Sequence, residues 1–149
     1  MDTNTIIIII IACAAAMLLS AVLYLVRRRR NRAEDFDLME GHDFEYYCAE
    51  LLRKSGFQEV EVTRGSGDYG IDILAEKEGV TYAIQCKCYT SPVGVKAIQE
   101  AYAGRDYYDR MVGAVLTNQY FTQPAVDAAR KLKILLWDRD YLEDMADSL

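Results

Sequence analysis

Three polar side chains with complementary chemistry lie close together in the segment 71–89. Side chains alternate across a strand, so Gln85 and Lys87 share one face of a predicted strand. Asp72 lies near the start of the preceding predicted strand and can face the same point. A carboxylate, an amide oxygen and an ammonium group then converge. This set suits a hard metal ion held by oxygen ligands, with a lysine that positions or deprotonates a water molecule.

The elements that position these residues are predicted from turn signals and hydrophobic periodicity. Residues 71–76 and 80–89 are predicted strands joined by a turn at 77–79. The other elements expected in the same domain are helices at 43–55, 95–108, 122–131 and 141–145 and strands at 59–64, 111–117 and 133–137. This order predicts an α/β fold in which a central mixed β-sheet carries helices on its faces.

Glu45 lies on the edge of the apolar stripe of the first predicted helix of the domain. Two interpretations stay open for this carboxylate. It either interacts favourably with the helix dipole from the first turn, or it leans over the sheet toward the metal. His42 is the only histidine, and with no second partner nearby we do not expect it to be catalytic.

The glycine-rich segment 64–70 leads into the central hairpin. It lacks the spacing and the terminal lysine of a P-loop, so we do not expect a nucleotide site there. Asp68, within this segment, suits a turn former and a ligand equally well.

Several cysteines and tyrosines are expected to be structural. The cysteines do not form a disulfide framework, and we expect buried free thiols in a reducing compartment. The tyrosines of the predicted helix 95–108 either stack on a partner or complete the core, and we expect them in the core. These residues are Cys13, Cys48, Cys86, Cys88, Tyr102, Tyr107 and Tyr108.

The charge of the chain argues against a broad nucleic-acid footprint. The net charge is −6 for the whole chain, and from Phe36 onward 12 basic and 20 acidic residues leave −8. Proteins that bind DNA over a wide surface are usually basic there. A small site that contacts DNA locally remains compatible with this charge.

A charge-free apolar segment occupies residues 6–26, which matches the roughly 20 residues that a helix needs to cross a bilayer. Four arginines, residues 27–30, follow it at once, and positive residues remain on the cytoplasmic side. A cleaved signal fits less well, because no basic residue precedes the segment. We therefore expect a single-pass anchor in the cell (inner) membrane at 1–26, a charged linker at 27–37 and a cytoplasmic domain at 38–149.

Several motifs of this domain together resemble the Mrr-like restriction endonucleases, a branch of the PD-(D/E)XK nuclease superfamily. The resemblance covers residues 38–142. It is carried by Gly41-His42-Asp43-Phe44-Glu45, Gly67-Asp68-Tyr69-Gly70-Ile71-Asp72, Ala83-Ile84-Gln85-Cys86-Lys87 and Thr117-Asn118-Gln119-Tyr120-Phe121-Thr122. Gln85 stands where the superfamily usually has glutamate, which is typical of the Mrr-like branch.

The resemblance implies a restriction-endonuclease-like fold and a role for each site residue. Asp72 would be the principal ligand of Mg²⁺, with Mn²⁺ as a substitute. Gln85 and the Cys86 backbone carbonyl would add oxygen ligands. Lys87 would hold or activate the attacking water, and Glu45 would complete the site directly or through water.

The function implied is that of a membrane-anchored, metal-dependent DNA endonuclease acting in defence against foreign or modified DNA. DNA would be its substrate partner, and a homodimer is the arrangement with which restriction-type nucleases commonly cut both strands. The alternative is a nuclease-fold module without catalysis that tethers DNA or a protein at the membrane. The neutral Gln85 and the acidic domain motivate this alternative.

Overall fold

A computed structural model describes residues 2–63 and 69–148 and divides the chain into two units, Met1–Asp35 and Phe36–Leu149. The first unit consists of most of helix α1, Thr3–Asp37. Within α1, Ile6–Arg27 is long and apolar enough to cross a membrane by length and composition, and a signal sequence near the N-terminus would pass the same test.

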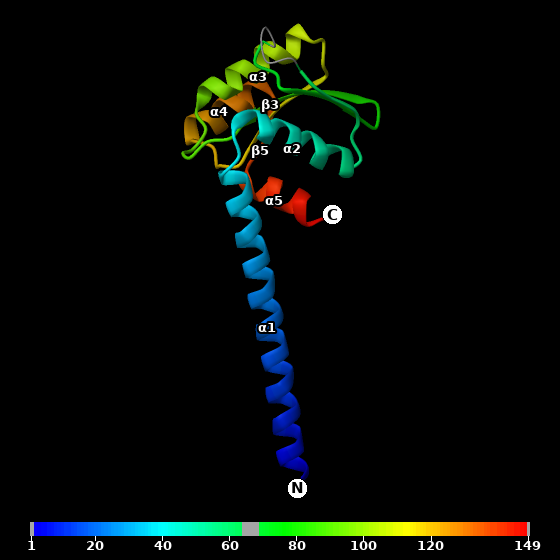
Figure 1. Ribbon diagram of the computed structural model, residues 1–149. Coiled ribbons are helices and arrows are strands. Elements are labelled where there is room, and N and C mark those ends of the chain that lie inside the picture. The colour runs from blue at the N-terminus through cyan, green and yellow to red at the C-terminus, as the bar shows by residue number, and fades with distance from the viewer. Residues whose placement is uncertain (1, 64–68, 149) are drawn as a thin grey trace. The chain divides into compact units, whose positions relative to one another are not determined.

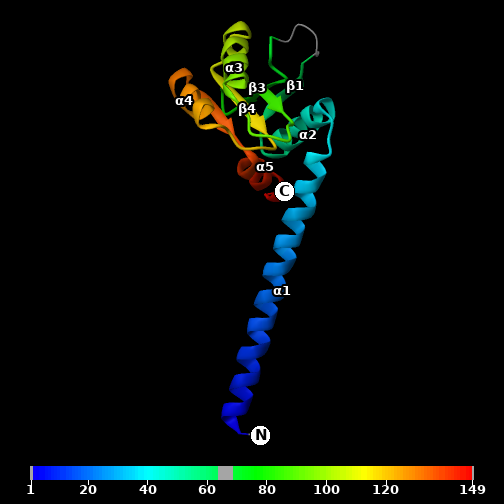
Figure 2. The same cartoon turned by 90° about the vertical axis from the view of Figure 1, so that its left-hand side faces the viewer.

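The second unit holds a five-stranded sheet with the strand order β1-β2-β3-β4-β5. β1, β2 and β3 pair antiparallel, and β3, β4 and β5 pair parallel, so the sheet is mixed as predicted. Figures 1 and 2 show α3 and α4 on one face of the sheet and α2 and α5 on the other. The elements are α2 Gly41–Lys54, β1 Gln58–Val62, β2 Ile73–Lys77, β3 Val80–Lys87, α3 Val95–Tyr107, β4 Val112–Thr117, α4 Gln123–Leu132, β5 Ile134–Trp137 and α5 Arg139–Asp147.

The central hairpin is tighter than the sequence predicts. Lys77 pairs with Val80, so only Glu78 and Gly79 form the turn, and Lys77 belongs to β2. Both turn residues have positive φ, at 54° for Glu78 and 78° for Gly79. Positive φ at both positions defines a type I′ turn, whose twist matches that of the flanking strands.

Helix α3 packs on the sheet through small residues, which places its tyrosines differently from the prediction. The buried residues of this helix are Ala97, Ile98, Ala101 and Gly104. Tyr102 is 37% exposed and Tyr107 is 57% exposed, so the expectation that both complete the core is wrong. Small side chains bring the helix axis close to the strands, and bulky residues beside them are then directed outward.

Gly104 marks the closest approach of α3 to the chain entering the hairpin. A Cβ atom on Gly104 would overlap the side chain of Ile71 and lie 3.0 Å from the carbonyl oxygen of Tyr69. We expect Gly104→Ala to lower the free energy of unfolding by about 2 kcal/mol, because a packed interior resists added volume. Urea unfolding followed by the fluorescence of Trp137, the only tryptophan, measures this change.

Gly41→Ala is the matched control for that experiment. Apart from the adjoining residues and the backbone of α2, no atom of residues 2–63 and 69–148 lies within 4 Å of the position that a Cβ on Gly41 would take. An unchanged urea midpoint for Gly104→Ala would contradict the close approach of α3 to Ile71.

The cysteines differ in environment. Cys48 and Cys86 are buried, as expected. Cys88 is half-buried and Cys13 is exposed on the helix of the first unit, so burial of all four is not observed. A hydrogen bond with Cys48, followed by burial, raises the pKa of the Cys86 thiol well above its ordinary value. This thiol therefore stays protonated and acts as a packing residue.

Candidate active site

Asp72 lies at the open end of the hairpin, opposite the turn, and is held there by contacts to β3. It is 8% exposed, and its Oδ2 accepts hydrogen bonds from Gln85 Nε2 at 2.7 Å and from the Cys86 backbone N–H at 2.6 Å. Its own N–H donates to the Ile84 carbonyl at 2.9 Å. The structure thus brings Asp72 and Gln85 into direct contact, and the backbone at Cys86 joins them.

Gln85 combines deep burial with an unused oxygen. The residue is 3% exposed, and its Oε1 has no hydrogen-bond partner among the described residues. A buried polar atom without a partner costs about 1–3 kcal/mol. A hard cation satisfies a carboxylate and an amide oxygen at once, so the donor chemistry of this pair fits Mg²⁺.

Gly70 and Glu100 lie close to the side chain of Gln85. A Cβ atom on Gly70 would lie 3.1 Å from Gln85 Oε1 and 2.9 Å from Glu100 Cβ. Gly70 has a φ of 77°, which a residue with a side chain seldom adopts. The backbone at Gly70 therefore forms one wall of the site, and Glu100 of α3 stands beside it.

Glu100 of α3 pairs with Lys87 and keeps it in its charged form. Its Nζ lies 2.9 Å from Glu100 Oε2, and its side chain is 18% exposed. Burial alone lowers the pKa of Lys87, but the hydrogen bond and the charge of Glu100, with smaller effects from Tyr89 and Asp72, outweigh it and raise the pKa. Lys87 is therefore protonated at neutral pH, which suits it to hold a water or an anionic oxygen better than to remove a proton.

Glu100 was missed by the sequence-based prediction. Lys96 precedes it by four residues, and this spacing is typical of an exposed helix pair. In the structure Lys96 Nζ is 3.7 Å from Glu100 Oε1 while Lys87 occupies the other oxygen. Only the packing of α3 across β3 brings Glu100 to the strand, so the linear pattern held no signal for it.

Glu45 lies on α2 and pairs with His42. His42 Nδ1 is 3.0 Å from Glu45 Oε2, and the Glu45 side chain is 22% exposed. Glu45 is also close enough to contribute to the raised pKa of the Cys86 thiol. The histidine thus has a carboxylate partner that its isolation in the sequence did not predict.

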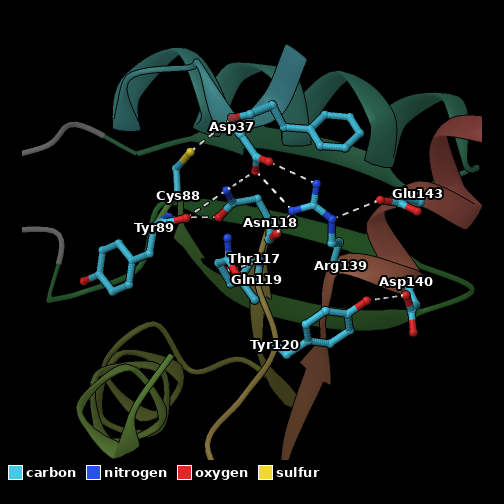
Figure 3. A network of polar contacts seen from close by, with 11 residues as sticks. Asp37, Cys88, Tyr89, Thr117, Asn118, Gln119, Tyr120, Arg139, Asp140 and Glu143 are labelled. Atoms are coloured by element: carbon cyan, nitrogen blue, oxygen red, sulfur yellow. Dashed lines mark hydrogen bonds and ion pairs between the residues drawn. The ribbon is translucent and has the colours of Figure 1, made fainter. Parts of the chain in front are cut away.

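The carboxyl-terminal end of β3 is braced by a polar network (Figure 3). Asn118 is 1% exposed; its Oδ1 accepts from the Tyr89 N–H at 2.8 Å, and its Nδ2 donates to the Tyr89 carbonyl at 3.0 Å and to Asp37 Oδ1 at 2.8 Å. Arg139 binds both carboxylate oxygens of Asp37 and donates to the Asn118 carbonyl at 2.8 Å. This network fixes the chain two residues beyond Lys87.

Only the end of the glycine-rich segment 64–70, Tyr69 and Gly70, is among the described residues. Residues 64–68, which include Asp68, lie outside the described residues. Within 2–63 and 69–148, no group of three or more histidine, cysteine, aspartate or glutamate side chains is placed to hold a metal. An ion bound between Asp72 and Gln85 would have an amide oxygen and a carboxylate as ligands.

A mixed sheet with an aspartate, a glutamine and a lysine at the end of its central hairpin is the arrangement of restriction-endonuclease-like folds. The family model described as Restriction endonuclease (Mrr_cat) matches residues 36–146. The chain belongs to this family.

Three solved structures share this architecture. A protein of unknown function has 25% identity and a TM-score of 0.63, and the match covers 73% of this chain and 66% of that one. The restriction endonuclease MspJI, in complex with a 27-mer oligonucleotide, has 20% identity and a TM-score of 0.58, and the match covers 80% of this chain and 30% of that one. AspBHI, a DNA modification-dependent restriction endonuclease, has 20% identity and a TM-score of 0.56, and the match covers 85% of this chain and 35% of that one.

At 20% identity the likeness to MspJI and AspBHI shows the fold alone. This chain spans about a third of the length of each and just under two thirds of the first protein. No curated protein matches the chain.

Proposed function

We propose that the chain is a metal-dependent DNA endonuclease that hydrolyses phosphodiester bonds. The observation that carries this proposal is the buried contact between Asp72 and Gln85, beside a protonated Lys87; the Gln85 amide oxygen has no hydrogen-bond partner among the residues that the structure describes. Family membership supports the same activity. By analogy with MspJI, whose structure includes an oligonucleotide, DNA is the proposed substrate.

Asp72 and Gln85 would hold Mg²⁺, or Mn²⁺ in its place, with the Cys86 backbone carbonyl as a further ligand. The N–H of Cys86 points to Asp72. In a strand the N–H and the C=O of one residue face the same neighbouring strand, so this carbonyl is directed to the side of Asp72. When bound, such an ion supplies a nucleophilic water at neutral pH and neutralises charge that develops on the phosphate.

Lys87 and Glu100 act as a unit in this proposal. Lys87 contributes a fixed positive charge at the place where the attacking water and the scissile phosphate meet. Glu100 keeps that charge at neutral pH and fixes the ammonium group through the 2.9 Å contact. Glu45, paired with His42, would reach the site from α2 directly or through water.

Removing the negative charge of Glu100 tests the role of the Lys87–Glu100 pair. We expect Glu100→Gln to move the alkaline limb of the pH–rate profile to lower pH, because burial then dominates and the pKa of Lys87 falls. Cleavage rates from neutral to alkaline pH measure the shift. Lys96→Gln, which removes an 89% exposed lysine from the same glutamate, is the control. An unmoved alkaline limb would exclude Glu100 as the group that sets the Lys87 pKa.

We further propose that residues 1–26 anchor the enzyme in the cell membrane, with residues 27–37 as a linker and 38–149 as a cytoplasmic nuclease domain. The apolar helix Ile6–Arg27 and the arginines that follow it support this topology. Defence against foreign or modified DNA and double-strand cutting by a homodimer belong to the same proposal.

A second candidate function is a catalytically inactive module that tethers DNA or a protein. The small number of ionisable metal donors among the described residues favours it. The two candidates differ in one assay, in which full-length protein in detergent is incubated with methylated and unmethylated plasmid in Mg²⁺, Mn²⁺ or EDTA. Metal-dependent cutting that Lys87→Ala abolishes supports the nuclease. DNA binding without cutting under every condition supports the tethering module.

A further inference from the structure

We propose that Tyr69 and Tyr107 form a stacking site for an unpaired base of the DNA, a few nucleotides from the proposed cleavage site. This inference rests on the proposed endonuclease function and narrows its substrate to DNA that presents an unpaired base. It follows from the position, exposure and backbone conformation of the two tyrosines.

The two rings form an exposed aromatic pair. Their centroids are 3.7 Å apart with an interplanar angle of 24°, and Tyr108 meets Tyr107 edge-on at 5.1 Å. Tyr69 and Tyr107 are each 57% exposed. Mutual stacking uses one face of each ring, so this exposure leaves aromatic surface in contact with solvent. Such a surface binds the π-face of any base, with little dependence on sequence.

The pair lies at the edge of the candidate active site. Tyr69 precedes Gly70, whose backbone walls the space around Gln85 Oε1 and Glu100. Tyr107 follows Glu100 by seven residues, which is two turns along the same face of α3 and a rise of about 10 Å. Consecutive nucleotides are about 3.4 Å apart along one strand. A base stacked at Tyr107 would therefore lie about three nucleotides from a phosphate at Lys87.

The backbone holds Tyr69 in an uncommon conformation. Its φ is 49°, in the left-handed region that residues other than glycine seldom adopt. Gly104 of α3 lies close to Ile71 and to the Tyr69 carbonyl, so the backbone beside Tyr69 is closely packed. Stacking on Tyr107 orders the Tyr69 ring before any substrate arrives, which reduces the entropy that binding must overcome.

Charge favours an aromatic contact at this place. The chain from Phe36 onward carries a net charge of −8, which argues against a broad phosphate-binding surface as the source of affinity for DNA. Stacking supplies affinity without positive charge. Bases within a duplex already stack on their neighbours, so a free tyrosine face selects a base that is unpaired or extruded.

The test uses full-length protein in detergent with EDTA, so that metal-dependent cutting is suppressed. Two duplexes carry the fluorescent base 2-aminopurine, one with that base paired and one with it unpaired. Binding is followed by fluorescence anisotropy of an end label, and stacking by quenching of 2-aminopurine. The variants are Tyr69→Ala, Tyr107→Ala and Tyr107→Phe. Tyr102→Ala is the control on the same helix, because the Tyr102 ring instead contacts the Arg105 guanidinium at 4.8 Å.

We expect wild type to bind the unpaired duplex more tightly and to quench its 2-aminopurine. Tyr107→Ala and Tyr69→Ala should each weaken that binding about 10-fold and reduce the quenching, whereas Tyr107→Phe and Tyr102→Ala should retain both. Trp137 fluorescence confirms that each variant is folded. If Tyr107→Ala is misfolded, binding and quenching by Tyr69→Ala test the stacking site instead.

Equal binding of the two duplexes by wild type, or wild-type binding by a folded alanine variant, would overturn the stacking site. If the same protein still cuts plasmid in Mg²⁺, the endonuclease function stands without it. If it neither binds nor cuts any DNA, both proposals fall together.

Discussion

Full-length Asp72→Asn protein is expected to cut plasmid DNA at least about 100-fold more slowly than wild type in Mg²⁺. Asparagine has nearly the same shape as aspartate, and its Oδ1 can still accept the Cys86 N–H that Asp72 now binds at 2.6 Å. The charge that would hold the cation is lost. The variant should therefore remain folded and lose its metal.

The melting temperature with and without Mg²⁺ separates this effect from simple unfolding. Mg²⁺ should raise the melting temperature of wild type, because a ligand that binds only the native state stabilises it, and this rise should vanish in Asp72→Asn. Asp127→Asn is the control, since the Asp127 carboxylate is 58% exposed on α4 and pairs with Arg130. Mg²⁺-dependent cutting by Asp72→Asn at the wild-type rate would remove Asp72 from the proposed metal site.

Asn118→Ala is expected to lower the free energy of unfolding by about 3 kcal/mol. The substitution deletes three hydrogen bonds and leaves the N–H and the carbonyl of Tyr89 without their side-chain partner. Urea unfolding monitored by Trp137 reports on this unit of the chain alone. Gln119→Ala is the matched control, because Gln119 joins the network through its backbone. A urea midpoint equal to that of wild type would contradict the bracing role of Asn118.

The penalty of Asn118→Ala should shrink in acid. Burial raises the pKa of Asp37, but hydrogen bonds from Arg139 and Asn118 outweigh it, and the net effect is a lowered pKa. A carboxyl group whose pKa is lower in the folded protein stabilises it above its unfolded-state pKa, and this stabilisation disappears as pH falls through the folded-state pKa. Below the folded-state pKa of Asp37, its carboxylate no longer stabilises either protein. The difference in unfolding free energy between wild type and Asn118→Ala is then smaller.

Local patterns were sufficient to predict the centre of this domain. Alternation along β3 placed Gln85 and Lys87 on one face, and the structure shows Gln85 bound to Asp72 and Lys87 bound to α3. The shared face and the contact between Gln85 and Asp72 depend on residues within one hairpin, where the register follows from a short turn. The mixed sheet was predicted for the same reason, because each element carried its own periodicity and turn signals.

Contacts between distant elements could not be predicted in this way. Glu100 meets Lys87 only because small residues let α3 approach the sheet, and Asp37 meets Arg139 across 102 positions of the chain. Thr117 and Asn118 end a parallel strand, a place typical of binding sites, yet both are buried and bond to the end of β3. Sequence spacing carries no information on such pairings, which tertiary packing decides.

The network around Asp37 also determines how the nuclease unit would bear a mechanical load applied through its amino-terminal end. Tension along the preceding helix enters at Phe36, which is 1% exposed in the core, and its carbonyl accepts the Cys88 thiol at 3.3 Å. From Asp37 the load divides between Arg139 at the start of α5 and Asn118 at the end of β4. Several hydrogen bonds on three elements would have to break together before the end of β3 is displaced. These hydrogen bonds would therefore stabilise the second unit against a force applied through its amino-terminal end.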